Sequence, residues 1–196
     1  MSDRKAEFSR KTSETDVSAF LNIDGTGNYD IDTGIGFFDH MLKLCCKHGL
    51  FDANIKAKGD LYVDFHHTVE DTGIVLGKCF DKALKDKRGI NRYGNAFIPM
   101  DEALAEVIVD ISGRPFLVFD ADFKNVKIGN FDAELIEEFF RAFCMNSNIT
   151  MHCRLLYGNN NHHKSEALFK AFGKAINEAV SIDPKIQGVM STKGVI

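Results

Sequence analysis

The apolar positions in the first half of the chain predict strands and helices in a definite order. Residues 16–23 alternate between apolar and polar, which is typical of a strand with one buried face. Residues 36–49 carry apolar side chains at helical spacing. The predicted inward faces are Val17, Ala19, Leu21 and Ile23 in the strand, and Phe38, Met41, Leu42 and Cys45 in the helix. The predicted elements are strands at 16–23 and 29–33 joined by a glycine turn, a helix at 36–49, a strand at 50–59, and a helix from near His66 to about Lys85.

The second half repeats this order. Its predicted elements are strands at 104–112 and 115–123, a helix at 132–146 capped by Asp132, a strand at 148–158, and a helix from His162 to about Val180. Each half therefore reads β-β-α-β-α, and the chain is an internal duplication. We expect an α+β fold in which two β-sheets pack around a shared helical core. The halves, 1–95 and 96–196, form one compact unit.

One motif, His-His-x-x-Glu, occurs twice, at 66–70 and 162–166. On a helix, the first histidine and the glutamate are four residues apart and share a face. The second histidine is rotated away by about 100°. One pentad therefore cannot direct both histidines and its glutamate at a single ion. Two such helices that face each other could build two metal sites, each with ligands from both.

The spacing of the repeat suggests one further ligand for each site. His66 and His162 are 96 residues apart, whereas Gly25 and Gly113 are 88 apart, so the halves differ by short insertions. His40 lies 26 residues before His66, and the matching position in the second half is near Glu138. His152 is the alternative to Glu138, but we interpret it as a strand residue near the site.

All of these candidate ligands are imidazoles or carboxylates. A single histidine pair is more often a hydrogen-bonded helix start, but two pentads at matching points of a duplication favour metal binding. Without thiolates, the set suits six-coordinate manganese or iron, or zinc, better than a structural cysteine–zinc site.

A second group of residues is cationic or polar. An arginine can hold a phosphate with two parallel hydrogen bonds, and a lysine adds a point charge. Each residue alone would suit a surface, but together they suggest an anionic substrate. They are Arg92, Arg114, Lys170, Ser191 and Lys193.

Composition excludes several classes of protein. The net charge is -4 with both signs mixed, which argues against a nucleic-acid or membrane-surface partner. No apolar run approaches the roughly 20 residues of a membrane span, and the first 16 residues are too polar for a signal peptide. The five cysteines lack C-x-x-C spacing, which indicates reduced thiols in a cytoplasmic protein.

At this point the motifs resemble those of a known family. The segments FFDHMLKLCCKHGLFD, VDFHHTVED, SGRP, GNNNHHKSEALFKAF and STKGV closely resemble imidazoleglycerol-phosphate dehydratases, in their monofunctional form. The resemblance runs from about Arg10 to the last residue. It implies dehydration of imidazole glycerol phosphate to imidazole acetol phosphate in histidine biosynthesis. It also implies a shell of 24 subunits, with active sites between subunits and two Mn²⁺ ions per site.

The resemblance also implies residue roles. One ion would be held by His40, His67, His162 and Glu166, and the other by His66, Glu70, His163 and Glu138. Family members often have histidine at the position of Glu138, and a carboxylate still binds a hard divalent ion. The residues expected to act in catalysis are Glu14, Glu70 and Glu166.

Glu14 would be the general base. The proton to be removed lies on a carbon without an adjacent carbonyl group, so it becomes acidic only after the imidazole has expelled the neighbouring hydroxyl. By resemblance Glu14 takes that proton, and a neighbouring subunit supplies this Glu14. The five cationic and polar residues would hold the phosphate. The main alternative is a non-catalytic metal-binding or metal-storage oligomer. A metal-dependent hydrolase is weaker, because the ligands leave no spare carboxylate in either pentad.

Overall fold

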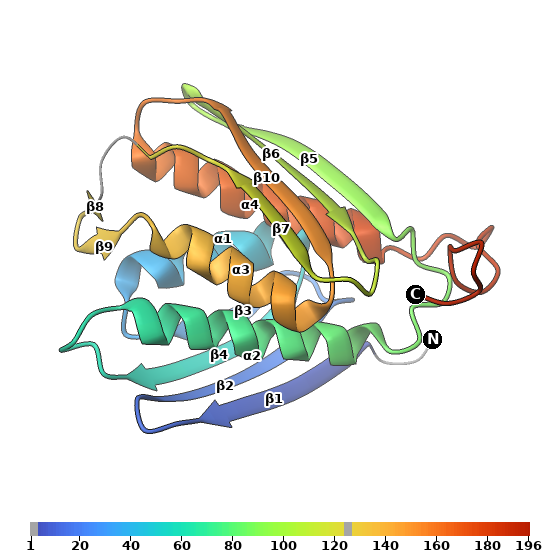
Figure 1. The fold of residues 1–196 in the computed structure, drawn as a ribbon, viewed down its shortest axis with the longest axis horizontal. Coiled ribbons are helices and arrows are strands. Elements are labelled where there is room, and N and C mark those ends of the chain that lie inside the picture. The colour runs from blue at the N-terminus through green and yellow to red at the C-terminus, as the bar shows by residue number, and fades with distance from the viewer. Residues whose placement is uncertain (1–3, 124–126) are drawn as a thin grey trace.

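The chain folds into two β-sheets with the helices between them (Figure 1). The computed structural model describes residues 4–123 and 127–196. The first half contains β1 (Lys5–Lys11), β2 (Thr15–Asn22), β3 (Tyr29–Asp32), α1 (Gly36–Gly49), β4 (Asp52–Gly59) and α2 (His66–Leu84). The second half contains β5 (Tyr93–Met100), β6 (Ala103–Asp110), β7 (Phe116–Asp120), β8 (Lys127–Ile128), β9 (Phe131–Asp132), α3 (Leu135–Ser147), β10 (Thr150–Tyr157) and α4 (Asn161–Val180). The predicted α+β fold is confirmed.

Both sheets have the same topology. The strand orders are β1-β2-β4-β3 and β5-β6-β10-β7, and the last strand of each is parallel to its neighbour. The strand expected at 29–33 therefore does not form a hairpin with the strand before it. Instead α1 carries the chain from β3 across to β4, because parallel neighbours require a crossover connection.

The first half contains one strand more than predicted, β1, and the second half contains three more, β5, β8 and β9. The order β-β-α-β-α is present, but β1 and β5 precede it, and both are sheet edges. The inward side chains of β1, Ala6 and Phe8, are only half-buried between charged neighbours, so its apolar signal is weak. The second sheet begins at Tyr93, so β5 spans the predicted division of the halves at 95 and 96.

The helices between the sheets form the core. The inward faces predicted for β2 and α1 are buried, as expected. At the centre lie phenylalanines from different helices, with ring centroids 5.3 Å apart for Phe38 and Phe139 and 5.0 Å for Phe140 and Phe169. Burial of this apolar surface is the main source of the stability of the fold.

The duplication extends to the contacts between helices. A Cβ on Gly173 of α4 would collide with the carbonyl oxygen of Cys45 on α1, and a Cβ on Gly77 of α2 would collide with that of Phe143 on α3. Gly77 and Gly173 are 96 residues apart, as are His66 and His162. Two glycines thus allow equivalent close approaches of the paired helices.

The insertion that makes the second half longer than the first lies before α3. β6 begins 88 residues after β2, but α3 ends 98 residues after α1, and β8 and β9 occupy the difference. These strands also correct one prediction: Asp132 belongs to β9, and Glu134 is the N-cap of α3. Leu50 (φ 59°) and Asn148 (φ 57°), also 98 residues apart, end α1 and α3 in the left-handed conformation.

The cysteines are free thiols in the interior, as predicted. Burial raises the pKa of the Cys46 and Cys144 thiols to about 12. No helix among residues 4–123 and 127–196 is both long and apolar enough to cross a membrane.

Candidate metal centre and active site

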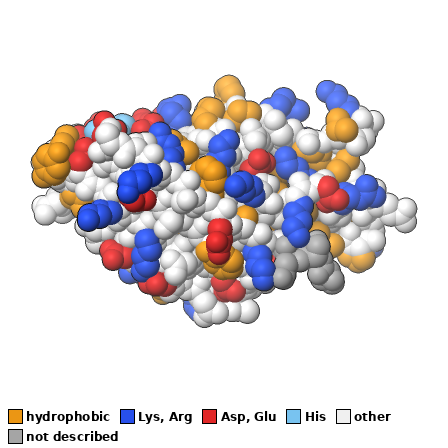
Figure 2. Space-filling model, turned by 90° about the horizontal axis from the view of Figure 1, so that it is seen from below, with side chains coloured by type: hydrophobic (Ala, Val, Ile, Leu, Met, Phe, Trp, Pro, Cys, Tyr) orange, Lys and Arg blue, Asp and Glu red, His pale blue; other side chains and the backbone are white. Residues whose placement is uncertain are grey.

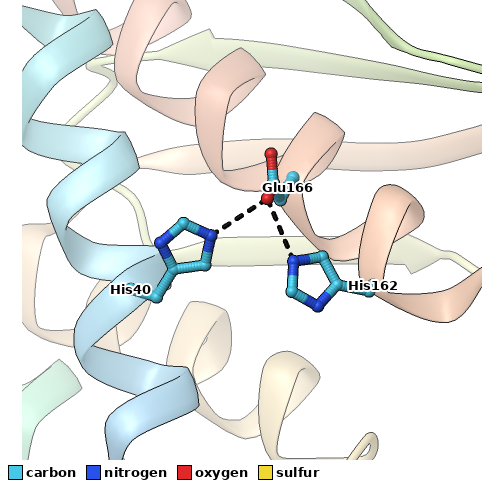
Figure 3. A group of neighbouring side chains, drawn as sticks. All are labelled: His40, His162 and Glu166. Carbon is cyan, nitrogen blue, oxygen red and sulfur yellow. Dashed lines mark hydrogen bonds and ion pairs between the residues drawn. The ribbon is translucent and has the colours of Figure 1, made fainter.

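Two helices of the core bring three of the predicted ligands together. His40 lies on α1, and His162 and Glu166 lie on α4 (Figure 3). Oε1 of Glu166 is 2.9 Å from Nε2 of His40 and 3.0 Å from Nε2 of His162. The three ligand atoms lie within 4.8 Å of one another, a spacing that a single divalent ion could bridge. The donor set of two imidazoles and one carboxylate fits such an ion.

Local structure fixes this arrangement. Asn160 caps α4 by accepting a hydrogen bond from the backbone N–H of His162, so the helix begins directly at the pentad. His162 and Glu166 then fall on one face, as their spacing predicted. The close approach of α1 at Gly173 brings His40 to the same place.

Glu166 stays ionised although it is only 10% exposed. Burial would raise the pKa of its carboxyl, but hydrogen bonds from Lys170, His40 and His162 outweigh burial and lower the pKa to about 2. The Lys170 ammonium lies 2.7 Å from Oε2 of Glu166 and 3.3 Å from Sδ of Met100. Lys170 thus lies in the ligand cluster, on the face where the sequence placed it.

The second histidine of each pentad points elsewhere, as the helical rotation predicted. Nδ1 of His67 lies 3.0 Å from a carboxylate oxygen of Asp60. Nδ1 of His163 lies 2.7 Å from Oε2 of Glu102. Each contact raises the pKa of the histidine, chiefly because the carboxylate accepts a hydrogen bond from the imidazolium. His67 is not in the cluster of His40, His162 and Glu166.

The remaining predicted ligands are His66, Glu70 and Glu138. Glu138 is the structural counterpart of His40, because the two are 98 residues apart, as are the ends of their helices. Its Oε1 lies 4.0 Å from Nε of Arg141. Among residues 4–123 and 127–196, no second group of three ligand atoms lies within 4.8 Å. Within the described part of the chain, three residues of one predicted ligand set therefore come together, and no three of the other do.

Four of the five predicted phosphate-binding residues line one cavity of about 220 Å³ at the end of the second sheet. They are Arg92, Arg114, Ser191 and Lys193. The fifth, Lys170, lies in the ligand cluster instead. The Arg92 guanidinium is engaged by Asp110 at 2.7 Å and by the Met190 carbonyl oxygen, so it also holds the C-terminal segment in place.

Glu14 lies near His67. Its side chain is 52% exposed, and Oε2 is 3.9 Å from Nδ1 of His67. The backbone N–H of Asp60 donates to the Glu14 carbonyl oxygen at 3.1 Å. Sequence reasoning missed Asp60 and Glu102. Glu102 is 61 residues from His163, and Asp60, although only seven residues before His67, lies outside the helix that carries it, so helical spacing does not predict either contact.

Two histidines outside the pentads lie apart from the ligand cluster. His152 is an exposed residue of β10, between two buried residues, so it faces away from the helices. It is a strand residue, as predicted, but it lies on the outer face of the second sheet. His48 lies in the last turn of α1, where burial lowers its pKa.

Comparison with known proteins decides the family. The profile of imidazoleglycerol-phosphate dehydratase matches residues 33–176. The chain is 61% identical to the imidazoleglycerol-phosphate dehydratase of Clostridium acetobutylicum, over 98% of both chains. It is 60% identical to that of Acetivibrio thermocellus, over 99% of this chain and 100% of the other.

The chain belongs to the imidazoleglycerol-phosphate dehydratase family. It is a hydro-lyase that acts in histidine biosynthesis by dehydrating imidazole glycerol phosphate. Solved structures of the family have the same fold. The dehydratase from Staphylococcus aureus is 43% identical, with a TM-score of 0.81 over 91% of this chain and 100% of the other. The dehydratase from Pyrococcus furiosus is 34% identical, with a TM-score of 0.83 over 96% of this chain and 100% of the other.

Proposed function

We propose that the chain dehydrates imidazole glycerol phosphate at a site with two Mn²⁺ ions that bind the substrate imidazole. The observation that carries the proposal is the convergence of His40, His162 and Glu166 on one point. Nitrogen and carboxylate ligands without thiolate suit Mn²⁺. In the proposed site His67 completes this set, and His66, Glu70, His163 and Glu138 form the other. When bound, the ions would polarise the imidazole and favour loss of the neighbouring hydroxyl.

The proposed site needs more than one copy of the chain. The ligand cluster is at the N-terminal part of α4, whereas the backbone N–H of Arg92 donates to the Ala179 carbonyl oxygen at the other end. Glu166 and Ala179 are 13 residues apart, which is about 20 Å along a helix. Figure 1 shows the C-terminal segment at this far end of the molecule. A substrate held at both places is therefore shared between subunits.

The surface also supports self-association into the proposed shell of 24 subunits. The outer face of the second sheet carries large apolar residues whose exposed fractions are 41–59%. They are Phe97, Ile108 and Phe116. On the side of the first sheet, acidic and basic side chains are scattered among apolar ones (Figure 2). Exposed apolar clusters are typical of protein interfaces.

The buried free thiols fit a cytoplasmic location.

In the proposed reaction the residues of the chain have distinct tasks. Arg114, Ser191 and Lys193 hold the phosphate, with Arg92 fixed beside them by Asp110. This anchoring orients the reacting carbon. Lys170 keeps Glu166 ionised and in place. Glu14 removes the carbon-bound proton once the hydroxyl has left.

A non-catalytic metal-storage oligomer would use the same ligands. It has no need for a phosphate cavity or for a carboxylate beside the ligands. The Arg114 cavity and the approach of Glu14 to His67 therefore favour catalysis.

Replacement of Glu14 tests the proposed base. Because a general base contributes about 10²–10⁴-fold to rate, Glu14→Gln should lower kcat by that factor while Mn²⁺ still binds. Turnover of imidazole glycerol phosphate by Mn²⁺-loaded protein is the measurement. Glu7→Gln, an exposed glutamate on β1, is the control and should retain full activity. Full activity of Glu14→Gln would exclude Glu14 as the base.

A further inference from the structure

The second histidines of the two pentads, His67 and His163, have the same kind of partner. Nδ1 of His67 meets both carboxylate oxygens of Asp60, at 3.0 and 3.2 Å. Nδ1 of His163 meets Oε2 of Glu102 at 2.7 Å. By contrast, His40 and His162 direct Nε2 toward Glu166. His40 and His162 therefore direct Nε2 into the ligand cluster. In His67 and His163 the carboxylate contacts Nδ1, so Nε2 is on the other side of the ring.

These contacts fix which ring nitrogen can bind a metal. An ionised carboxylate only accepts hydrogen bonds, so Nδ1 carries the proton. In the neutral ring Nε2 then carries the lone pair that a metal requires. The nearest carboxylate to Nε2 of His163 is that of Asp101, at 3.7 Å, which is beyond hydrogen-bond distance.

We infer that Asp60 and Glu102 are positioning residues that present Nε2 of His67 and His163 to the metals. The inference rests on the proposed function. Neither carboxylate belongs to the proposed ligand sets, and neither would touch the substrate. Each would act through its histidine, by holding the ring orientation and the Nδ1–H tautomer.

Asp60 is held through burial and its backbone, and Glu102 through its carboxylate. The side chain of Asp60 is only 13% exposed, and its backbone N–H donates to the Glu14 carbonyl oxygen. Asp60 therefore also links His67 to the segment that carries the proposed base. Oε1 of Glu102 accepts backbone hydrogen bonds from Asn159 and Asn160, directly before α4. Such anchoring distinguishes these contacts from surface ion pairs, which are weak and mobile.

The two partners are not copies of each other. Asp60 lies seven residues before His67, whereas Glu102 lies 61 residues before His163. The duplication therefore did not place both carboxylates, and each half reaches the same contact by a different route. This recurrence points to a requirement of the histidine itself.

The test is Mn²⁺ affinity, measured from the electron paramagnetic resonance signal of free Mn²⁺ during titration of the assembled protein. Asp60→Ala and Glu102→Ala should weaken binding by about 10–100-fold. Asp60→Asn and Glu102→Gln keep an acceptor oxygen and should lie closer to wild type than the alanine variants do. Asp30→Ala, which removes an exposed carboxylate paired with Lys56, is the control and should bind as wild type does.

A second comparison separates positioning from a merely structural effect. In a His67→Ala background, Asp60→Ala should cause no further loss of affinity. Equal losses in both backgrounds, or wild-type affinity of both alanine variants, would overturn the inference. If Asp60→Ala does not give the wild-type circular dichroism spectrum, Asp60→Ser takes its place.

The proposed function can fail separately. If the wild-type protein binds no Mn²⁺, the proposed function fails, and the inference fails with it. If His67→Ala weakens binding but Asp60→Ala does not, only the positioning role fails.

Discussion

At the residue scale, Glu166 shows how a buried carboxylate can stay available to a metal. A carboxyl group that is removed from water normally becomes protonated. Here two imidazoles and one ammonium lie within 3.0 Å of its oxygens and hold its pKa at about 2. The neighbouring cation and imidazoles thus keep the carboxylate negatively charged. Lys170 holds Oε2, and Oε1 therefore faces the two histidines.

Arg114 allows a direct test of the phosphate cavity. It is exposed, and it makes no ion pair with any residue among 4–123 and 127–196, whereas Arg92 is held by Asp110. Arg114→Ala should therefore remove a phosphate contact without loss of stability. Because a hydrogen bond to a charged group contributes about 1.5–3 kcal/mol, kcat/KM should fall by about 10–100-fold.

Steady-state kinetics with imidazole glycerol phosphate measure this effect. Arg88→Ala, an exposed arginine in the loop between α2 and β5, serves as the control and should leave kcat/KM unchanged. Unchanged KM and kcat in Arg114→Ala would remove this residue from the phosphate site.

At the scale of elements, the periodicity of the sequence predicted the four helices and most strands. Helices α1 and α4 bury wide apolar faces, so their signal is strong. β1 and β5 were missed because edge strands bury little and carry charged or irregular residues. The position of β3 beside β4 could not be predicted either, since alternation identifies a strand but not its neighbour.

The glycine contacts between helices give a prediction about stability. Gly173→Ala should lower the free energy of unfolding by about 1–3 kcal/mol, because its Cβ would push α4 away from the backbone of α1. Gly77→Ala should act similarly between α2 and α3. Urea unfolding at one protein concentration measures the effect.

Gly36 provides a matched control on a helix. A Cβ there meets no atom within 4 Å, so Gly36→Ala should be neutral or stabilising by up to about 1 kcal/mol. If Gly173→Ala were as stable as Gly36→Ala, the close approach of α1 and α4 would not limit packing.

At the scale of the whole molecule, the division of the proposed site predicts that metal and assembly depend on each other. If ligands for one ion come from several subunits, each ion links those subunits, and binding stabilises the assembled state. Chelation of Mn²⁺ should therefore disperse the 24-subunit shell into smaller species. Light scattering before and after chelation measures the change in mass, and added Mn²⁺ should restore it.

A variant that lacks one proposed ligand provides a second test. His67→Ala should bind Mn²⁺ more weakly, so its assembly should require a higher Mn²⁺ concentration than that of the wild type. A shell that keeps its full mass after complete chelation would contradict metal-linked assembly.

The sequence by itself determined the duplication, the helical placement of both pentads and the separation of the two histidines within each pentad. These features depend only on local periodicity, which every residue in a helix obeys. It also identified Glu138 as the counterpart of His40, because the repeat fixes the offset.

The tertiary structure alone decided which of these residues meet. The contact of α1 with α4 joins His40 to Glu166, 126 residues away along the chain. The tertiary structure also separates the ligand cluster from the Arg114 cavity, and it brings Glu102 to His163, 61 residues further along the chain. Such contacts depend on how whole elements pack, and that packing is set by the combined burial of many side chains rather than by any local pattern.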